Sequence, residues 1–451
     1  MKRIAFLFSV LFLLLCAVPL AAMLILGPAE PAANQVLAAA PDLTSQDGSL
    51  NGNYLSDLSR YVDQRFGFRQ ELITLQARMT AAVFRESATD SVILGREGWL
   101  FYSDTLADYQ GTAPLSDRAV WAAAHVLALM QECAGEAGAR FLFVMAPNKN
   151  TLYPQYMPPR CAASETRSNW ARLKEQLDAQ GVAYADLIPV LSAERDPVYY
   201  RTDSHWTPYG SALAHDAILN ALGAEAALAD EAFTVGAHVG DLQEMLYPAD
   251  PAAENGPVLA RERQFTHLGG FRSPEDMTIR TESGGALGSL LMFRDSFGNT
   301  LYADMAESFS RACFSRSMPV RMDLLEQTAA DTVVMELVER NLSWLATRAP
   351  VMAAPRRELP EGAGQGQSVK IQMQESSPLE GLACYTGLLP ELDADSPVLV
   401  ALDGVCYEAT PAGLEDGSYT LYAPPARSAA VYARIHGKWV SCSADLCSQL
   451  P

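Results

Sequence analysis

Leu290-Leu-Met-Phe-Arg-Asp-Ser-Phe-Gly-Asn299 joins a short apolar run to a polar turn that contains a serine. The apolar run has the length of a buried strand, and the residues after the turn have the spacing of a helix over 300–307. A second strand is expected at 311–314. Strand, helix and strand in this order are typical of a parallel sheet that is covered on both faces.

The same alternation runs from residue 117 to residue 353, apart from one stretch, 224–285, whose periodicity is weak. We expect helices at 118–137, 165–180, 208–222, 320–327 and one that ends near 345, and further strands at 141–145, 182–187 and 332–338. The predicted fold class is therefore α/β, with a doubly wound parallel sheet. Ligands of such sheets bind beyond the carboxyl ends of the strands.

A second polar stretch, Tyr199-Tyr-Arg-Thr-Asp-Ser-His-Trp-Thr-Pro-Tyr-Gly210, places Asp203 two positions before His205. Its Thr-Pro pair has the residue types of a helix N-cap and first helical residue. In such a loop a carboxylate can accept a hydrogen bond from one imidazole nitrogen and leave the other free as a base. A base needs a nucleophile, and Ser296 stands at the tip of its turn. We interpret Ser296, His205 and Asp203 as a catalytic triad.

Two more residues follow expected strands and can reach the same crevice, Asn148 and Arg340. The backbone N–H groups of Ser296 and Gly298, together with the Asn148 side chain, are candidate donors to an oxyanion. Asn148 is also an ordinary turn residue type, so that alternative stays open.

Asp295, directly before the serine, is expected to support the turn, although it could instead orient the base. The other histidines are expected to be structural, namely His125, His215, His238, His267 and His436.

The chain begins with an apolar segment, because Lys2 and Arg3 precede a run from residue 4 to residue 26 without a charged side chain. A run of this length can span a bilayer, and the flanking charges orient the N-terminus towards the cytoplasm. A cleaved signal peptide is the alternative, since small residues stand at 36–40, but its apolar core is usually shorter. We expect an uncleaved anchor and a chain that otherwise lies outside the cytoplasm.

The composition sets limits on the function. With 451 residues, 49% of them hydrophobic, the chain can form about two to three domains. A net charge of -20 and a pI near 4.7 argue against a nucleic-acid partner, which needs clustered Lys and Arg. The cysteines and histidines lack zinc-site spacing, so we expect neither metal nor cofactor.

Seven of the eight cysteines follow the apolar segment, in a compartment where disulfides are permitted. The pairs Cys442 with Cys447 and Cys384 with Cys406 are candidates, and an odd number leaves at least one free thiol. Burial as apolar residues is the alternative for some of them.

The expected domain order follows from composition and periodicity. A tether at 29–53 follows the segment 1–28 and leads to a catalytic domain at 54–352. That domain begins with helices at 54–62 and 70–84 and a hairpin formed by 91–94 and 99–102. A Pro- and Gly-rich linker at 353–367 then precedes strands without helices at 368–451, for which a small β-sandwich is the natural prediction.

Five short motifs occur in this order along the chain: Gly95-Arg-Glu-Gly-Trp-Leu-Phe-Tyr102, Ala146-Pro-Asn-Lys149, Asp203-Ser-His-Trp206, Asp295-Ser-Phe297 and Val338-Glu-Arg-Asn-Leu342. As a set they resemble the SGNH-hydrolase-like domain of the alginate O-acetyltransferases AlgJ and AlgX and the related DHHW proteins, over roughly 51–350. The resemblance implies a Ser296 nucleophile, a His205 base and an orienting Asp203. It further implies that Tyr302, Arg340 and Trp206 line the substrate site.

The resemblance also implies a function. This is an extracytoplasmic O-acetyltransferase that moves an acetyl group, through a serine acyl-enzyme, onto hydroxyls of a cell-surface or secreted polysaccharide. Acetyl donors such as acetyl-CoA are cytoplasmic, so a membrane-bound O-acyltransferase is the implied donor partner. An acetyl esterase of the same fold and a non-catalytic envelope scaffold or glycan-binding protein are the alternatives.

Two departures from the family pattern bear on these alternatives. Arg294 stands where a glycine commonly precedes the Asp-Ser pair, which affects the shape of the turn and the oxyanion hole. The C-terminal region has no close match to the carbohydrate-binding module of AlgX.

Overall fold

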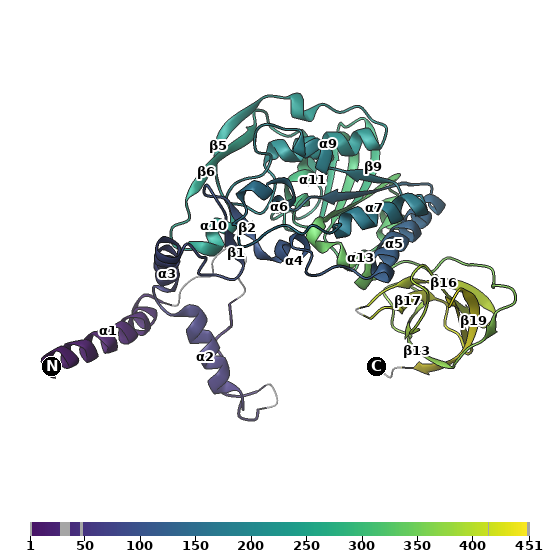
Figure 1. Cartoon of the computed structure of the whole chain (residues 1–451), viewed down its shortest axis with the longest axis horizontal. Coiled ribbons are helices and arrows are strands. Elements are labelled where there is room, and N and C mark those ends of the chain that lie inside the picture. Colours follow the sequence, from purple (N-terminus) through teal and green to yellow (C-terminus); the bar gives the residue numbers. More distant parts are fainter. Residues whose placement is uncertain (1, 28–36, 46–47, 414, 449–451) are drawn as a thin grey trace.

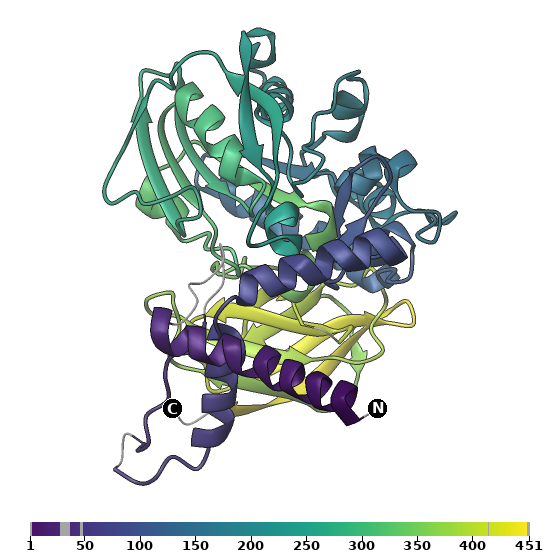
Figure 2. The same cartoon turned by 90° about the vertical axis from the view of Figure 1, so that its left-hand side faces the viewer.

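The computed structural model describes residues 2–27, 37–45, 48–413 and 415–448. An α/β body forms the centre of the molecule, the N-terminal helix projects from one side of it, and a β-domain lies at the other side (Figure 1). The second view shows the long helices α1 (Lys2–Leu26) and α3 (Arg69–Phe84) as separate rods in front of the rest of the chain (Figure 2).

The body is built on a seven-stranded sheet. In spatial order its strands are β4 (Tyr184–Asp186), β3 (Arg140–Ala146), β11 (Thr332–Val338), β9 (Leu287–Phe293), β10 (Phe309–Ser315), β8 (Thr278–Ser283) and β7 (Phe265–His267). The first five are parallel, as expected. β8 pairs antiparallel with β10, and β7 pairs antiparallel with β8, which corrects the prediction of a purely parallel sheet.

Helices cover both faces of this sheet. One face packs against α5 (Asp117–Glu136), α7 (Asn169–Gln180), α12 (Leu324–Thr328) and α13 (Ser343–Thr347); the other packs against α8 (Ile188–Ser192), α9 (Pro208–Ala221) and α11 (Gly298–Ser308). Neighbouring side chains of β3 enter opposite cores, Phe143 on the first face and Val144 on the second. Because both of their faces are buried, the central strands β3, β9 and β11 are largely apolar runs.

Some helix ends differ from the expected ones. The helix predicted from residue 165 begins at Asn169, because the Ser168 hydroxyl caps it by accepting from the backbone N–H of Ala171 at 3.2 Å. At α9 the prediction is confirmed, since the Thr207 hydroxyl accepts from the backbone N–H of Gly210 at 3.1 Å and Pro208 is the first helical residue. Both caps satisfy a backbone donor that the helix itself leaves free.

The region 224–285 contains more structure than its periodicity indicates. It forms a hairpin of β5 (Phe233–Val239) and β6 (Ala253–Leu259), the helix α10 (Asp241–Leu246) and the sheet strands β7 and β8. Side chains of β5 are exposed or half-buried on both faces. A strand without a buried face has no hydrophobic alternation, so sequence reasoning missed it.

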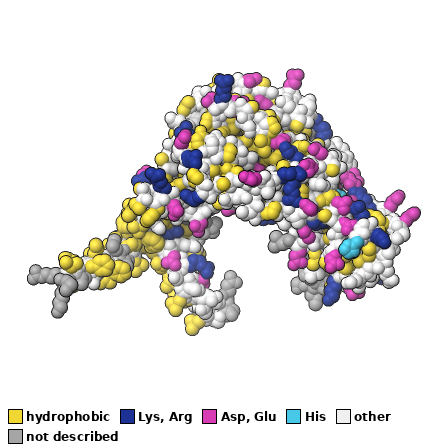
Figure 3. Space-filling model, in the orientation of Figure 1, with side chains coloured by type: hydrophobic (Ala, Val, Ile, Leu, Met, Phe, Trp, Pro, Cys, Tyr) yellow, Lys and Arg dark blue, Asp and Glu magenta, His cyan; other side chains and the backbone are white. Residues whose placement is uncertain are grey.

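The N-terminal helix α1 contains a 20-residue segment, Phe6–Ile25, whose mean hydropathy is 2.7. By length and composition it is able to cross a membrane, and a signal sequence would pass the same test. Hydrophobic side chains cover most of the visible face of this projecting helix in the space-filling view (Figure 3). The expected tether at 29–53 lies partly outside the described residues.

The helix α2 (Tyr54–Arg65) and the helix α3 follow, and α3 reaches the body where the Thr74 hydroxyl accepts from the backbone N–H of Ala249 at 3.0 Å. The expected hairpin is formed by β1 (Val92–Leu94) and β2 (Leu100–Tyr102). Short helices complete the body: η1 (Ser103–Thr105), α4 (Leu106–Tyr109), α6 (Lys149–Leu152), η2 (Pro154–Tyr156), η3 (Leu228–Asp230) and η4 (Glu339–Asn341).

The C-terminal region is a closed barrel and not the predicted sandwich. Its strands are β12 (Gly364–Gln365), β13 (Val369–Gln374), β14 (Ala383–Leu388), β15 (Val398–Leu402), β16 (Val405–Pro411), β17 (Ser418–Ala423), β18 (Ala429–Ile435) and β19 (Lys438–Ser448). The long last strand pairs with β18 along its first part and with β13 along its second part, which closes the sheet. Closure removes the edges that two separate sheets would leave.

The seven cysteines from Cys133 to Cys447 are free in the structure, which contradicts both candidate disulfides. Cys442 and Cys447 lie on one extended strand, where five residues span roughly 16 Å, far beyond the reach of a disulfide. Cys384 and Cys406 lie on β14 and β16, which β17 separates. Neither pair of side chains can meet.

Candidate active site

Three neighbouring strands of the sheet, β3, β11 and β9, end at the same edge because they are parallel. Asn148 follows β3, Arg340 follows β11 and Ser296 follows β9. The sheet therefore brings three of the predicted site residues to one edge, although they are far apart in sequence.

Ser296 lies in the segment 294–299, here called the serine turn, between the end of β9 and the start of α11. The carboxylate of Asp295 fixes this turn, since its Oδ1 accepts from the backbone N–H of Phe297 at 2.9 Å. Its Oδ2 accepts from the backbone N–H of Val338 at 2.9 Å and from Asn341 Nδ2 at 3.1 Å. These bonds tie the turn to the end of β11, and they engage Asp295 in support of the turn.

The residues 199–207, here called the base loop, bring a histidine and a carboxylate to the serine. His205 Nε2 lies 2.9 Å from Ser296 Oγ, and His205 Nδ1 lies 2.8 Å from Asp203 Oδ1. With its proton on Nδ1, the imidazole donates to Asp203 and accepts from the serine hydroxyl. The ring packs against Phe297 at a centroid distance of 4.9 Å. The three residues predicted as a triad thus form one hydrogen-bonded chain.

The surroundings shift both titrating groups of this chain. Burial acts to raise the pKa of Asp203, but hydrogen bonds from His205 and His238 outweigh it and hold that pKa well below its usual range. For His205, burial acts to lower the pKa, while the hydrogen bond and charge of Asp203, with Asp241 nearby, raise it above its ordinary value. The carboxylate therefore stays ionised and strengthens the histidine as a base.

Two residues from the region 224–285 join this chain, and sequence reasoning missed both. His238 Nε2 lies 2.8 Å from Asp203 Oδ2, so this histidine, which was expected to be structural, lies at the site. Asp241 accepts from the backbone N–H of Ser204 at 2.7 Å and from the Ser204 hydroxyl at 2.5 Å, and its Oδ2 lies 3.6 Å from His205 Nδ1. Neither residue lies in a recognisable motif, and their segment has no hydrophobic periodicity from which its structure could be predicted.

Lys149 holds the base loop through hydrogen bonds to its backbone carbonyl groups. Its buried ammonium group donates to the backbone carbonyl oxygens of Leu100 at 2.6 Å, Arg201 at 2.7 Å and Asp203 at 2.9 Å. Burial lowers the pKa of Lys149 to about 7, although the charge of Asp203 acts in the opposite direction. Lys149 belongs to the motif Ala146-Pro-Asn-Lys149, and the sequence analysis assigned no role to this lysine. In the structure it acts as a clamp between β2 and the base loop.

Candidate oxyanion donors follow β3 and β9 at this edge of the sheet. The Oδ1 atom of Asn148 accepts from the backbone N–H of Arg340 at 3.3 Å, while its buried Nδ2 has no partner among the described residues. Within that same part of the chain, the backbone N–H groups of Ser296 and Gly298 also lack an acceptor. Three donors without acceptors near one edge match the need of an oxyanion.

Arg294 occupies the place of the expected glycine without blocking the turn. Its guanidinium donates to Asn299 Oδ1 at 2.6 Å and to the backbone carbonyl of Pro274 at 2.5 Å, so it points away from the serine. Its aliphatic stem lies against Gly298, where an added Cβ would come within 2.4 Å of it. The glycine at 298 is therefore required by the arginine at 294.

The other substrate-lining predictions have different outcomes. The Arg340 guanidinium lies over the rings of Phe297 and Tyr102, at 5.6 and 5.4 Å, and so faces the serine turn. Trp206 is only 1% exposed and packs against Phe297 at 5.0 Å, so it supports the site from the core and does not line it. Tyr302 packs against Phe314, with its hydroxyl 3.5 Å from His267, towards the β7 side of the sheet.

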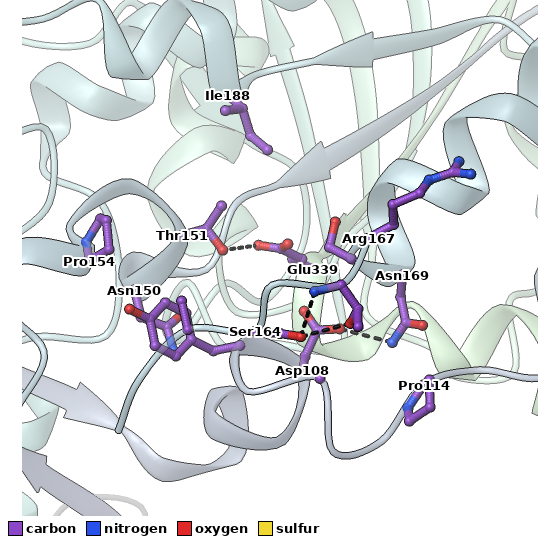
Figure 4. A pocket seen from close by; sticks show the side chains of 15 residues that line it. Asp108, Pro114, Asn150, Thr151, Pro154, Ser164, Arg167, Asn169, Ile188 and Glu339 are labelled. Atoms are coloured by element: carbon purple, nitrogen blue, oxygen red, sulfur yellow. Dashed lines mark hydrogen bonds between the residues drawn. The ribbon is translucent and has the colours of Figure 1, made fainter. Parts of the chain in front are cut away.

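A cavity of about 270 Å³ lies beside α6, whose Asn150 and Thr151 line it (Figure 4). Glu339 lines it and accepts from the Thr151 hydroxyl at 2.6 Å and from the backbone N–H of Asn148 at 2.9 Å. Burial, with the nearby charge of Asp108, raises the pKa of Glu339 to about 7. None of the hydrogen-bonded chain of Ser296, His205 and Asp203 lines this cavity, so Glu339 acts by fixing the backbone of Asn148.

Asp203, His205 and Asp241 lie close enough together to hold a metal ion. The oxygens of Asp203, however, already accept four N–H bonds, two from His205, one from His238 and one from Asp241. A carboxylate has about four lone-pair sites, so none is left for a cation. The donor set fits a hydrogen-bond network and not a metal centre.

Residues 92–268 match the family model described as "SGNH hydrolase-like domain, acetyltransferase AlgX". Residues 92–268 therefore resemble an AlgX-type SGNH hydrolase-like domain. This match confirms the resemblance and contains three of the five motifs that first indicated it, those at 95–102, 146–149 and 203–206. The match includes the base loop, His238 and Asp241, and ends before the serine turn, so Ser296 rests on the geometry described above.

Two curated relatives of the chain are named as probable alginate O-acetylases. The chain is 27% identical over 218 residues to the "Probable alginate O-acetylase AlgJ" of Pseudomonas syringae pv. tomato, covering 46% of this chain and 54% of that protein. It is 27% identical over 221 residues to the protein of the same name from Pseudomonas putida, covering 47% and 56%. The chain spans about half the length of these relatives.

A solved structure, the O-acetyltransferase domain of Pseudomonas putida AlgJ, aligns with 56% of this chain and 92% of its own. The identity is 19% and the TM-score is 0.39.

Proposed function

We propose that this protein is an O-acetyltransferase that modifies hydroxyl groups of a cell-surface or secreted polysaccharide. The observation that carries the proposal is the continuous chain from Ser296 Oγ through His205 to Asp203, at the carboxyl edge of an AlgX-type domain. The names of the relatives, alginate O-acetylases, support the reaction class.

The reaction proceeds by nucleophilic catalysis. His205 removes the proton of Ser296 as the serine oxygen attacks the carbonyl carbon of an acetyl donor, and the donor leaves with that proton. An acceptor hydroxyl then attacks the acetyl-serine, with His205 again as the base, and the serine is regenerated. The raised pKa of His205 makes it a stronger base, and it acts in the neutral form, so the rate rises with pH through that pKa.

The tetrahedral intermediates carry a negative oxygen. Asn148 Nδ2 and the backbone N–H groups of Ser296 and Gly298 are its proposed donors, and each such donor typically contributes about 3 kcal/mol. Arg340 lies over Phe297 at the rim of the serine turn, where its planar cation suits contact with an acidic or hydroxyl-rich acceptor.

The location and the donor belong to the proposal. We propose that α1 anchors the chain in the cell membrane with the AlgX-type domain outside the cytoplasm. A membrane-bound O-acyltransferase would then deliver the acetyl group across the bilayer, and the anchor would keep the domain beside it.

The test is the acetylation of Ser296 in the full-length protein in detergent, with an activated acetyl ester and candidate oligosaccharides. Mass spectrometry of protein and sugar should find acetyl on Ser296 and then on the sugar. Both signals should disappear in Ser296→Ala and remain in Ser310→Ala, a serine of β10 at the opposite end of the sheet.

The other outcomes separate the remaining functions. Acetate released without acetylated sugar would favour the esterase. A wild-type serine that takes no acetyl group would overturn the acyl-enzyme mechanism and favour a scaffold.

A further inference from the structure

The hairpin of β5 and β6 grips the base loop with two residues that face each other across the strands. His238 of β5 pairs with Glu254 of β6 in the hairpin register. Glu254 accepts from the backbone N–H groups of Arg201 at 2.9 Å and Thr202 at 2.7 Å. His238 stacks on Tyr200 at a centroid distance of 3.9 Å and bonds Asp203 Oδ2 at 2.8 Å.

The backbone of the hairpin comes equally close. An added Cβ at Gly240 would lie 2.2 Å from the carbonyl oxygen of Thr202, so only glycine permits this approach. The side chain of His238 is 32% exposed, so it is not a core residue placed there by packing alone. The hairpin is thus built to hold the carboxylate of the base loop.

Asp203 has a competitor for the proton of His205. Asp203 Oδ1 lies 2.8 Å from His205 Nδ1, and Asp241 Oδ2 lies 3.6 Å from the same nitrogen. If the Asp203 carboxylate turned about its own axis, Asp241 would become the better acceptor. Among the described residues, Oδ2 accepts from His238 at 2.8 Å and from the backbone N–H of Asp241 at 3.2 Å, while Oδ1 also accepts from the backbone N–H of His205 at 2.9 Å.

We infer that His238 is a positioning residue of the catalytic chain: its N–H holds the Asp203 carboxylate with Oδ1 towards His205, so that Asp203 and not Asp241 orients the base. This inference rests on the proposed function of the same site. Other charged or titratable groups face this cluster from the elements packed around it: Lys149 of α6, Glu244 of α10, Glu254 of β6, Arg340 after β11 and Tyr200 of the base loop. Each of them stays in place in the variants below.

Two substitutions separate the donor from the ring. His238→Phe keeps an aromatic ring to stack on Tyr200 and removes the N–H, whereas His238→Gln removes the ring and keeps an N–H at a similar reach. A third variant, Thr234→Ala, changes the exposed part of the same strand. The rate constant of Ser296 acetylation by an activated ester, measured by mass spectrometry of the full-length protein against pH and ester concentration, is the readout.

We expect His238→Phe to lower the limiting rate about tenfold, the effect of one lost hydrogen bond to a charged group, with little change in the ester concentration at half-saturation. The low-pH limb of the rate–pH profile of this variant should move to lower pH. The reason is that an Asp203 carboxylate held less firmly stabilises the imidazolium form of His205 less. His238→Gln and Thr234→Ala should stay within about threefold of the wild type, a difference smaller than one such hydrogen bond.

An unchanged rate or acid limb in His238→Phe, or a loss in His238→Gln as large as in His238→Phe, would overturn the inference while leaving the proposed function intact. A wild-type Ser296 that takes no acetyl group would overturn both. Thermal unfolding of each variant identifies any loss that comes from misfolding.

Discussion

The serine turn and the base loop meet at one hydrogen bond but are held in place by different means. The serine turn is fixed by its own residues and by the adjacent end of β11, through Asp295, Arg294 and Gly298. The base loop is held by side chains of elements outside the seven-stranded sheet, Lys149 of α6 and His238 of β5 among them.

The difference has a physical meaning for the site. The sheet and the helix after it fix both ends of the strand-to-helix turn, and its outside contacts go mainly to the neighbouring strand end, as in the bonds of Asp295 to Val338 and Asn341. The base loop joins α8 to α9, with one backbone bridge of its own between Tyr199 and Trp206, so its shape depends on tertiary contacts. Substitutions in other elements of the fold should therefore disturb the base loop more than the serine turn.

The largest effect is expected from the two aspartates. Asp203→Asn should lower the rate of Ser296 acetylation on the order of 10⁴-fold, because it disfavours the tautomer in which His205 acts as a base. Asp295→Asn should cost only about tenfold, since one of its oxygens still accepts from Phe297. Equal losses in the two variants would mean that Asp295 takes part in orienting the base, the alternative that the sequence left open.

A smaller effect is expected from the clamp below the base loop. Lys149→Met keeps the length of the side chain but leaves three buried carbonyl oxygens without their donor, so the free energy of unfolding should fall by about 4 kcal/mol. Lys174→Met is the matched control, because Lys174 pairs with Asp186 near the surface and should contribute less than about 1 kcal/mol. Urea unfolding of both variants measures the difference. Similar losses of unfolding free energy in the two variants would mean that Lys149 does not act as a clamp.

The pH dependence of stability tests Glu339. Its pKa is raised to about 7 in the folded protein, so between the unfolded pKa and pH 7 the folded state binds the extra proton. Stability from this group is present at low pH and is lost as the pH rises through 7, by up to about 3 kcal/mol. Unfolding free energies at pH 5 and pH 8 should thus differ less in Glu339→Gln than in the wild type or in the exposed-residue control Glu262→Gln. Parallel slopes in all three proteins would contradict this origin.

The smallest expected effect lies inside the serine turn. Gly298→Ala should cost about 2 kcal/mol of stability, because the added methyl group meets the Arg294 stem. In an Arg294→Ala background the same change should cost about 1 kcal/mol less. A double-mutant cycle from unfolding measurements gives this coupling, and strictly additive costs would mean that the two residues do not compensate each other.

The parts of the fold that could be predicted are those with a buried face. The parallel strands β3, β9 and β11 are apolar runs of strand length, and the Thr-Pro pair before α9 marks a helix start. The hairpin of β5 and β6 has no such face and left no pattern. The C-terminal strands were recognised as strands, but nothing local in a strand says whether its sheet closes, so the sandwich was wrong.

The sequence by itself determined which chemical groups the site contains, Ser296 on a strand-to-helix turn and Asp203 with His205 on a loop, because residue type and local spacing express them. Only the tertiary structure decided how they are held. The bond between His205 and Ser296 joins positions 91 residues apart, and those of Asp203 to His238 and Lys149 span 35 and 54 residues. Such contacts depend on how whole elements pack, and this packing leaves no mark on the neighbouring residues in the chain.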